Sequence, residues 1–300
     1  MALRFGQNVV SFIAGAPHLR TAELRRAESP SLRDRPKRAQ DQPIALITGA
    51  SGGIGSEIAL SLAQRGYGCV LLGRDEDRLA ALEDQLRSQS LSPPEHICVD
   101  LAARGSVQTL MSEMRKRQME IGILVNCAGC AVHGEFVEAD RNALMEMLQV
   151  NILALTELTR MVLPGMIARG SGYILNMASV AAYMPGPLLA AYFASKAYVL
   201  SFSEALAQEL GGTGVSVTAV CPGPTRTQFA RRAGLQETPA FRGRLMSPAA
   251  VAEAALDAMF QGKRVLVPDL SLRLQMIPAR LLPRRLLAII ARRYHTLPEK

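Results

Sequence analysis

The chain has 300 residues, of which 49% are hydrophobic and 20% charged, and it contains no tryptophan. This composition is typical of a globular protein with a sizeable core and excludes a disordered or collagen-like chain. The formal net charge is +8, but basic patches with interleaved aromatic residues are missing from the sequence, so we expect no nucleic-acid partner. No run of 18 apolar residues occurs, so we expect no simple membrane-spanning helix.

Residues 1–42 form a basic segment that we expect to be a poorly ordered extension. Eight arginines and lysines precede Pro43, against four acidic residues. The apolar stretch VVSFIAGAP, residues 9–17, faintly resembles a signal peptide but is short. Arginine enrichment would also fit a mitochondrial presequence. A solvated extension of a cytoplasmic protein is the favoured interpretation.

The cysteines give no indication of a disulfide framework or a metal site. They are five in number, and their odd count favours a reducing compartment. Cys127 and Cys130 form a C-x-x-C motif, which a redox pair or half a zinc site also uses. No second Cys or His pair stands at zinc spacing, and the four histidines are far apart in sequence. We therefore interpret the motif as a structural turn and expect no metal.

From residue 44 onward, short apolar runs alternate with helical patterns, as βαβ units do. We expect an α/β fold, a doubly wound, Rossmann-type parallel sheet in a single domain over residues 43–268, followed by a basic amphipathic tail over 269–300. In such sheets ligands bind at the carboxyl ends of the strands. The expected strands are 44–48, 69–73, 96–100, 122–126, 173–179, 215–220 and 264–268.

The sequence TGASGGIG, residues 48–55, lies between the first expected strand and an amphipathic helix. Glycines there let the backbone turn tightly and approach a pyrophosphate, whose charge meets the positive end of the following helix. The strand, loop and helix together predict a nucleotide site. Its candidate cofactor contacts are Gly49, Ser51, Gly53, Ile54 and Gly55.

The end of the second expected strand bears on the choice between NAD and NADP. An acidic residue at this position would hold the ribose hydroxyls of NAD, but Arg74 follows Gly73 here. A guanidinium pairs well with a 2′-phosphate, so NADP is favoured over NAD. Asp75 could instead cap the next helix or reach a ribose hydroxyl. Asp100, followed by Leu101, could accept a bond from adenine or cap a helix.

Tyr192 and Lys196 stand four residues apart in AAYFASKAY. Residues at this spacing share one face of a helix, so both side chains can point into one cleft. A nearby ammonium stabilises phenolate, and we expect it to lower the pKa of Tyr192 and make this residue a general acid. Because the spacing also arises by chance, its context decides: Ser179 ends the fifth expected strand and could donate to a substrate carbonyl in the same cleft.

The chain here resembles the short-chain dehydrogenase/reductase family, through TGASGGIG, NCAG (126–129), Asn151, Ser179, YFASK and CPGPTRT (221–227), in that family's order. The resemblance implies that Tyr192 exchanges the proton, Lys196 lowers its pKa and binds the nicotinamide ribose, Ser179 polarises the carbonyl, and Asn151 holds a water of a proton relay. It implies cofactor contacts by Asn126, Ala128, Gly129, Pro222, Gly223, and either Thr225 or Thr227.

The resemblance also implies an oxidoreductase that forms a homodimer or homotetramer through helices near residues 145–165 and 196–210. We expect hydride transfer between a nicotinamide cofactor and a carbonyl or alcohol, with NADPH favouring reduction. Two alternatives stay open: reduction of 3-oxoacyl thioesters, whose acidic carrier would dock on arginines 231, 232, 242 and 244, and an idle NADP-binding sensor or scaffold. Such a sensor would more naturally lack Tyr192, Lys196 or Ser179.

The substrate and the tail are less defined by the sequence. Apolar residues in the loop 180–190 indicate either an apolar substrate or ordinary packing. In the tail, Arg284, Arg285, Ala288 and Arg292 can share one helix side, and Leu286, Leu287, Ile290 and Tyr294 another. This pattern fits packing or a subunit contact, a peripheral contact with an anionic membrane, or a lid over the cleft.

Overall fold

The structure is a computed structural model that describes residues 44–89, 93–279 and 282–297, with backbone only for 275–279. Internal contacts divide the chain into residues 1–35 and a second unit, Pro36–Lys300. The first unit lies outside the described residues, as does the whole of the expected basic extension, residues 1–42. All residues that the structure describes belong to the second unit.

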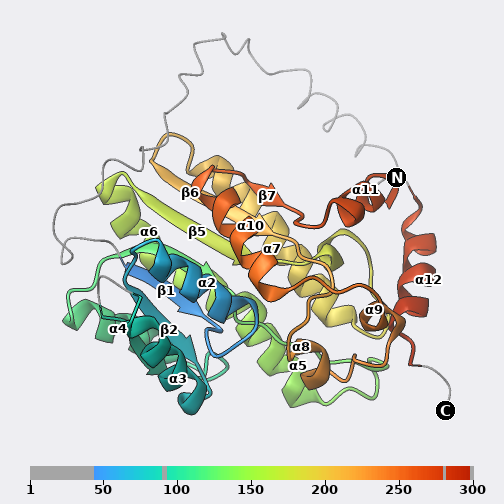
Figure 1. The fold of residues 1–300 in the computed structure, drawn as a ribbon. Helices are drawn as coiled ribbons and strands as arrows, with labels where there is room; N and C mark the ends of the chain where they lie inside the picture. The colour runs from blue at the N-terminus through green and yellow to red at the C-terminus, as the bar shows by residue number, and fades with distance from the viewer. Residues whose placement is uncertain (1–43, 90–92, 280–281, 298–300) are drawn as a thin grey trace, which may run out of the picture. The chain divides into compact units, whose positions relative to one another are not determined.

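A seven-stranded parallel sheet with the order β3-β2-β1-β4-β5-β6-β7 forms the centre of this unit (Figure 1). The predicted doubly wound α/β fold is thus confirmed. Apolar side chains without alternation form β1 and β2, as strands covered on both faces require. The strands are β1 Ile44–Thr48, β2 Cys69–Gly73, β3 Glu95–Cys98, β4 Ile121–Asn126, β5 Gly172–Met177, β6 Val215–Val220 and β7 Val265–Leu266.

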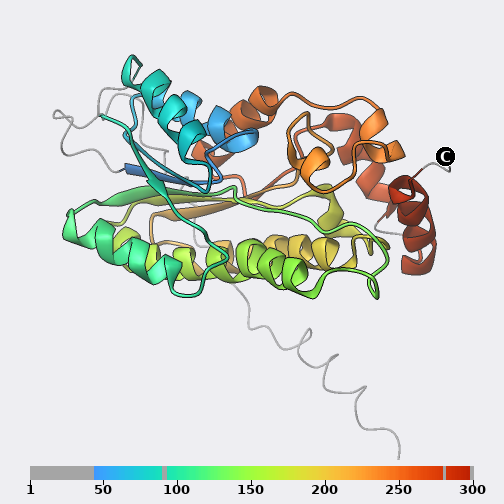
Figure 2. The ribbon, with the colours of Figure 1, turned by 90° about the horizontal axis from the view of Figure 1, so that it is seen from below.

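Helices cover both faces of the sheet (Figure 2). On one face, α2 Ile54–Gln64, α3 Glu76–Arg87 and α10 Pro248–Phe260 pack over the strands. On the other, α4 Ser106–Lys116, α6 Leu155–Arg169 and α7 Ala190–Glu209 do so. The remaining helical elements of the described residues are α5 Arg141–Leu148, η2 Gln149–Ala154, η3 Val180–Tyr183, α8 Phe229–Arg232, α9 Pro239–Arg242, α11 Leu270–Ala279 and α12 Arg284–His295.

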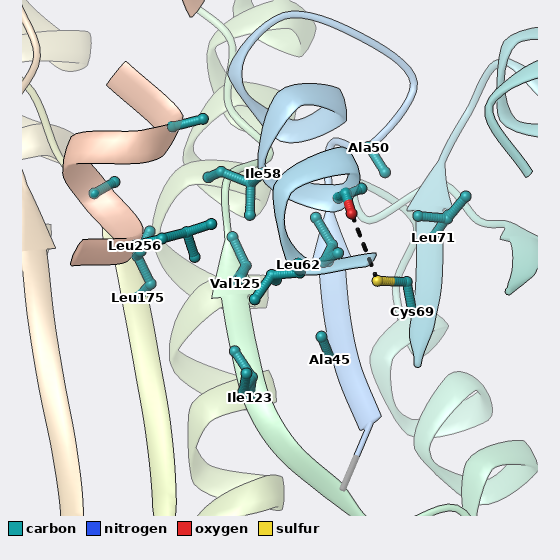
Figure 3. Packing of buried hydrophobic residues seen from close by; sticks show 14 of the residues in the cluster. Ala45, Ala50, Ile58, Leu62, Cys69, Leu71, Ile123, Val125, Leu175 and Leu256 are labelled. Carbon is teal, nitrogen blue, oxygen red and sulfur yellow. Dashed lines mark hydrogen bonds between the residues drawn. The ribbon is translucent and has the colours of Figure 1, made fainter. Parts of the chain in front are cut away.

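The larger core cluster joins α2 and α10 to the middle of the sheet (Figure 3). Ile58 and Leu62 of α2 are fully buried against Val125 of β4 and Leu256 of α10. Burial of a leucine or isoleucine side chain contributes about 1.5–3 kcal/mol. These contacts hold the helix that follows the glycine loop firmly on the sheet, so the start of α2 has a defined position at the strand ends.

One helical stretch, Arg141–Arg169, is long and apolar enough to span a membrane by length and composition alone. It consists of α5, η2 and α6 and contains charged residues, which is why no continuous apolar run marks it in the sequence. Buried residues of α6, such as Leu158 and Met166, pack on the sheet. A core helix of a globular protein passes the same test, and this packing explains the stretch in that way.

His96 of β3 connects the strand to α3 through two carboxylates. Its Nε2 lies 2.8 Å from Glu76 Oε1, and its Nδ1 bonds Glu83. These bonds raise the pKa of His96. A raised folded-state pKa stabilises the fold at low pH, and this contribution disappears as the pH rises past the unfolded value of about 6.5 and through the folded value.

We therefore predict that His96→Gln lowers the melting temperature more at about pH 6 than at about pH 9, because the charged histidine supplies its stability only below its folded pKa. Thermal unfolding of both proteins at the two pH values measures the difference. Glu83→Gln, which removes one partner, should reduce this pH dependence. An equal loss at both pH values would contradict the role of the His96 charge.

Candidate active site

The site lies where the strand order reverses, between β1 and β4, as expected for a doubly wound sheet. Thr48 ends β1, and its Oγ1 accepts hydrogen bonds of 3.0 Å from the backbone N–H groups of Cys127 and Ala128. A Cβ added at Gly49 would lie 2.9 Å from Ala128 Cα. The loops after β1 and β4 are therefore locked together, and only glycine fits at position 49.

The glycine loop leaves the start of α2 open to a ligand. Gly53 forms the N-cap and supplies no side-chain cap bond, so the first N–H groups of α2 stay available. A Cβ at Gly55 would lie 2.3 Å from Gly49 O, whereas one at Gly52 would meet nothing within 4 Å. The loop therefore packs closely against itself at Gly55, whereas at Gly52, which lines the cleft, it has free space around it. This arrangement fits the pyrophosphate of a dinucleotide.

The residues after β2 and β3 have separate roles in the structure. Asp75 is the N-cap of α3, accepts from Arg78 N and pairs with the Arg78 guanidinium at 3.0 Å. Among the described residues, the exposed guanidinium of Arg74 has no ion pair, and it lines the cleft. Asp100 does not cap α4, which begins at Ser106 after Gly105. Its carboxylate accepts from Ala102 N at 3.0 Å and stays at the cleft with Leu101.

Tyr192, Lys196 and Ser179 come together at the end of β5. Lys196 is 5% exposed, and its Nζ donates to Met177 O at 2.8 Å. The Nζ lies 5.8 Å from the centroid of the Tyr192 ring. The Ser179 hydroxyl acts on Tyr192 in the direction that lowers its pKa, and Ser179 Oγ accepts from Ala181 N at 3.1 Å. Both Tyr192 and Lys196 lie on α7 and line the same cleft.

Burial dominates the acid–base properties of this pair. It raises the pKa of Tyr192 to about 12, although the Ser179 hydrogen bond acts in the opposite direction. It lowers the pKa of Lys196 to about 8. The expected lowering of the Tyr192 pKa by Lys196 is not found in this structure, because burial disfavours the phenolate and the lowering contribution comes from the Ser179 hydroxyl instead. Tyr192 carries its proton at neutral pH, as a proton donor must.

Asn151 lies in η2, a π-helical turn between α5 and α6. Its side chain bonds the backbone of Cys130 in both directions, at 3.0 and 3.1 Å, and donates to Ser195 Oγ at 3.1 Å. A Cβ at Gly129 would lie 3.3 Å from both Asn151 Oδ1 and Lys196 Nζ. Because Gly129 has no side chain, the Asn151 amide and the Lys196 amine can both lie close to its Cα.

The cleft has a volume of about 1480 Å³, which exceeds the roughly 300–1,000 Å³ of most ligand pockets and suits a dinucleotide with a substrate. All candidate site residues line it except Gly55, Asn126 and Asn151. Asn126 donates to Asn176 Oδ1 at 2.9 Å and to Thr159 Oγ1, so its side chain links β4 to β5 and α6. Of the two threonines, Thr227 contacts the glycine loop, since a Cβ at Gly53 would lie 3.1 Å from its Cγ2.

The tail reaches the same cleft from the carboxyl-terminal side. Leu287 and Ala291 of α12 are buried and line it, as do Ile290 and Tyr294, which are also partly exposed to solvent. Leu286, predicted on the same side, is exposed and does not line the cleft. Of the three interpretations of the tail, the lid over the cleft is therefore supported, because residues of α12 line the cleft of the same chain.

Several residues at the site carry no signal in the sequence. Ser195 donates to Tyr192 O at 2.7 Å and accepts from Asn151. The carbonyl of Met177 holds Lys196. Both are ordinary residue types, and only the fold brings them to these groups. Cys127 and Cys130 are free thiols in the turn after β4, and burial raises the pKa of Cys127 to about 12, which makes it unreactive.

The sequence matches the short chain dehydrogenase family over residues 43–238. The chain belongs to this family. The match includes β1 to β6 and the whole Tyr192, Lys196 and Ser179 arrangement. It ends before α10, so the family assignment says nothing about α11 and α12. As a family member, the protein is an oxidoreductase with a Rossmann-type fold.

Relatives and solved structures agree with this assignment. An uncharacterized oxidoreductase of Staphylococcus saprophyticus is 35% identical over 77% of this chain and 96% of its own. The very-long-chain 3-oxoacyl-CoA reductase of Rattus norvegicus is 33% identical over 62% of this chain and 61% of its own.

Two solved structures have similar folds. A short-chain dehydrogenase from Sphingobium yanoikuyae in complex with NADPH is 35% identical, with a TM-score of 0.72 over 79% of this chain and 92% of that one. The bulky-bulky ketone specific alcohol dehydrogenase from Comamonas testosteroni is 31% identical, with a TM-score of 0.68 over 80% and 92%.

We predict that Gly129→Ala lowers kcat about tenfold or more, because its methyl group pushes Lys196 Nζ and the Asn151 amide from their present positions. Gly211→Ala is the matched control: its Cβ would meet Gln208 O at the same 3.3 Å, and neither residue lines the cleft. Steady-state kinetics with NADPH and a ketone that the wild-type protein reduces, together with melting temperatures, compare the two variants. Equal activity of both variants would contradict a functional spacing at Gly129.

Proposed function

We propose that this protein is an NADP-dependent reductase of apolar carbonyl compounds. The observation that carries the proposal is the buried group of Tyr192, Lys196 and Ser179 at the end of a cleft that continues to the glycine loop. A neutral tyrosine beside a serine hydroxyl can protonate and polarise a carbonyl oxygen. An idle sensor or scaffold has no need of this buried lysine, which folding must desolvate.

NADP is the cofactor that the residues favour. Asp75 is committed to the α3 cap and to Arg78, whereas Arg74 is free to pair with a 2′-phosphate. Thr227, whose side chain lies beside Gly53 of the glycine loop, is the better candidate for a phosphate contact. Thr225 Oγ1 already donates to Gly223 O at 2.9 Å. The complex of the Sphingobium yanoikuyae dehydrogenase with NADPH supports the same choice.

Each residue has a defined task in the proposed reduction. When bound, the cofactor supplies a hydride to the carbonyl carbon. Tyr192 donates its proton to the carbonyl oxygen, and Ser179 donates a hydrogen bond to that oxygen. Lys196 has N–H groups beyond the one on Met177 O, which can hold ribose hydroxyls and stabilise the phenolate left behind. Asn151 positions the turn at Cys130 and would hold a water that returns the proton.

An apolar substrate is supported by the side chains at the far end of the cleft. Met184, Leu189 and Phe241 line it together with α12. The similar alcohol dehydrogenase from Comamonas testosteroni is specific for bulky-bulky ketones, and the similar protein from Rattus norvegicus is a very-long-chain 3-oxoacyl-CoA reductase. Both kinds of molecule would place a large apolar group beside the reacting carbonyl.

Reduction of 3-oxoacyl thioesters is the second candidate, and two arginines favour it. Arg232 and Arg244 line the cleft, where they could meet the phosphates of a thioester carrier. Arg242 instead pairs with Glu237 at 2.8 Å. If the carrier hypothesis is correct, reversing the charge of Arg232 and Arg244 weakens thioester turnover and spares free ketones.

We also propose a homo-oligomer in the cytoplasm, built through the helices around residues 145–165 and 196–210. Met145, Leu153 and Tyr198 are apolar or aromatic residues of these helices, and they are 50%, 55% and 37% exposed. Tyr198 stacks on Phe202 and its hydroxyl lies 2.9 Å from Thr156 Oγ1, which gives α6 and α7 one shared surface. A second copy of the chain would cover it. In the same proposal, residues 1–42 are an extension and 269–300 a tail.

We predict that the purified protein oxidises NADPH in the presence of apolar ketones or 3-oxoacyl thioesters, and that Tyr192→Phe lowers turnover by about a hundredfold or more, because the proton donor is lost. Absorbance at the NADPH band follows the reaction, and NADPH binding by the variant is the control. Near-full turnover of Tyr192→Phe would contradict the mechanism. Tight NADPH binding without turnover of any carbonyl would favour the sensor.

We predict that Arg74→Gln raises the KM for NADPH about tenfold or more and leaves the KM for NADH nearly unchanged, because a charged hydrogen bond to phosphate is worth about 1.5–3 kcal/mol. Arg104→Gln removes the same charge from an exposed residue outside the cleft and serves as the matched control. Steady-state kinetics with both cofactors measure the ratio. An unchanged preference in Arg74→Gln would contradict the assignment of NADP to this residue.

A further inference from the structure

Helix α12 forms part of the substrate end of the cleft, although it lies outside the segment that matches the family. Leu287 and Ala291 are 5% and 3% exposed and line the cleft from the inside. Ile290 and Tyr294, at 37% and 55% exposure, line it as well and therefore border its opening. The apolar face of α12 thus contributes two buried residues to the inner surface of the cleft and two exposed residues to the edge of its opening.

Specific contacts hold α12 against the elements that carry the chemistry. His133 Nε2 donates to His295 O at 2.8 Å, and Arg292 pairs with Glu135 at 2.5 Å. Both partners lie in the segment after β4, downstream of the turn at Gly129. The His295 ring also meets the Phe193 ring edge-on at 5.2 Å, and Phe193 directly follows Tyr192.

The helix packs in addition against α9 (Figure 1). These contacts come from three separate parts of the chain, so α12 has a defined position against Phe193, the residue after Tyr192. A wall fixed in this way restricts the size of the substrate, because packed protein interiors accommodate added atoms only at a cost of strain.

We propose that α12 is the wall that selects substrates by size, and that Ala291 determines how far the apolar group of a carbonyl compound extends past Tyr192. This inference rests on the proposed reductase function and deepens it. Among the residues of α12 that line the cleft, Ala291 has the smallest side chain, so it leaves the most room on this side of the cleft. The substrate class is therefore carbonyl compounds with a long or bulky apolar group, rather than short ketones.

Opposite substitutions on the two wall residues test this proposal. Ala291→Phe fills the space, and we expect kcat/KM for 2-undecanone with NADPH to fall about tenfold or more, mainly through KM, with 2-butanone changed less than about twofold. Leu287→Ala enlarges the space and should increase the preference for ketones bulkier than 2-undecanone. Ala288→Phe is the control, since Ala288 lies on the same helix but does not line the cleft.

A binding measurement separates this proposal from the reductase function itself. Calorimetry of 2-undecanone binding to the protein saturated with NADP⁺ needs no turnover, and melting temperatures show whether each variant is folded. Weaker binding by folded Ala291→Phe, with Ala288→Phe unchanged, supports the wall even if no ketone is reduced. Equal losses for long and short ketones in Ala291→Phe, together with an unaltered size preference in Leu287→Ala, would overturn it.

Discussion

The junction of β1 and β4 is the constraint on which the site depends. Thr48 is buried between the two strands, and its hydroxyl satisfies two backbone N–H groups of the turn after β4. Without this hydroxyl each N–H would be left unpaired in the interior, at a cost of about 1–3 kcal/mol. These two hydrogen bonds hold the glycine loop after β1 beside the turn after β4. The Thr48 side chain therefore positions two of the segments that line the cleft relative to each other.

The second constraint is the burial of an amine next to a phenol. Desolvation disfavours both charged forms, lowering the pKa of Lys196 to about 8 and raising that of Tyr192 to about 12. The hydrogen bond from Lys196 Nζ to the carbonyl of Met177 offsets part of the cost of burying the lysine. Asn151 Oδ1 and Lys196 Nζ both lie next to Gly129, which has no side chain to separate them. Burying these groups does not serve stability. In the proposed reduction, the ammonium of Lys196 would stabilise the phenolate that forms when Tyr192 donates its proton.

Local patterns were sufficient for the parts of the site that depend on local geometry. The glycine loop follows a strand, and Tyr192 and Lys196 share a helix face because residues four apart always do. The strand ends were less predictable. β3 and β5 stop short of Asp100 and Ser179, and β7 is reduced to Val265–Leu266, because pairing with the neighbouring strand decides where a ladder ends. Asp75 proved to be a cap because Arg78 folds back onto it.

Other features had no local signal. The π-helical turn that carries Asn151 depends on the Cys130 backbone and on Ser195, which are distant in sequence. The side chain of Asn126 turns to Asn176 rather than to the cleft, which only the packing of β4 against β5 determines. The role of α12 was equally open, because its pattern of apolar and basic residues is the same whether a membrane, a subunit or its own cleft covers it.

The two ends of the cleft are therefore determined by different parts of the chain. The cofactor end consists of turns between strands of the family segment, where backbone geometry leaves little freedom. The substrate end combines segments after β5, β6 and β7, which the sheet does not constrain. Differences in such segments change what a family member recognises without disturbing the proton donor. Since α12 contacts His133 and Glu135, which lie downstream of the turn after β4, it connects the substrate end of the cleft to the segment that follows this turn.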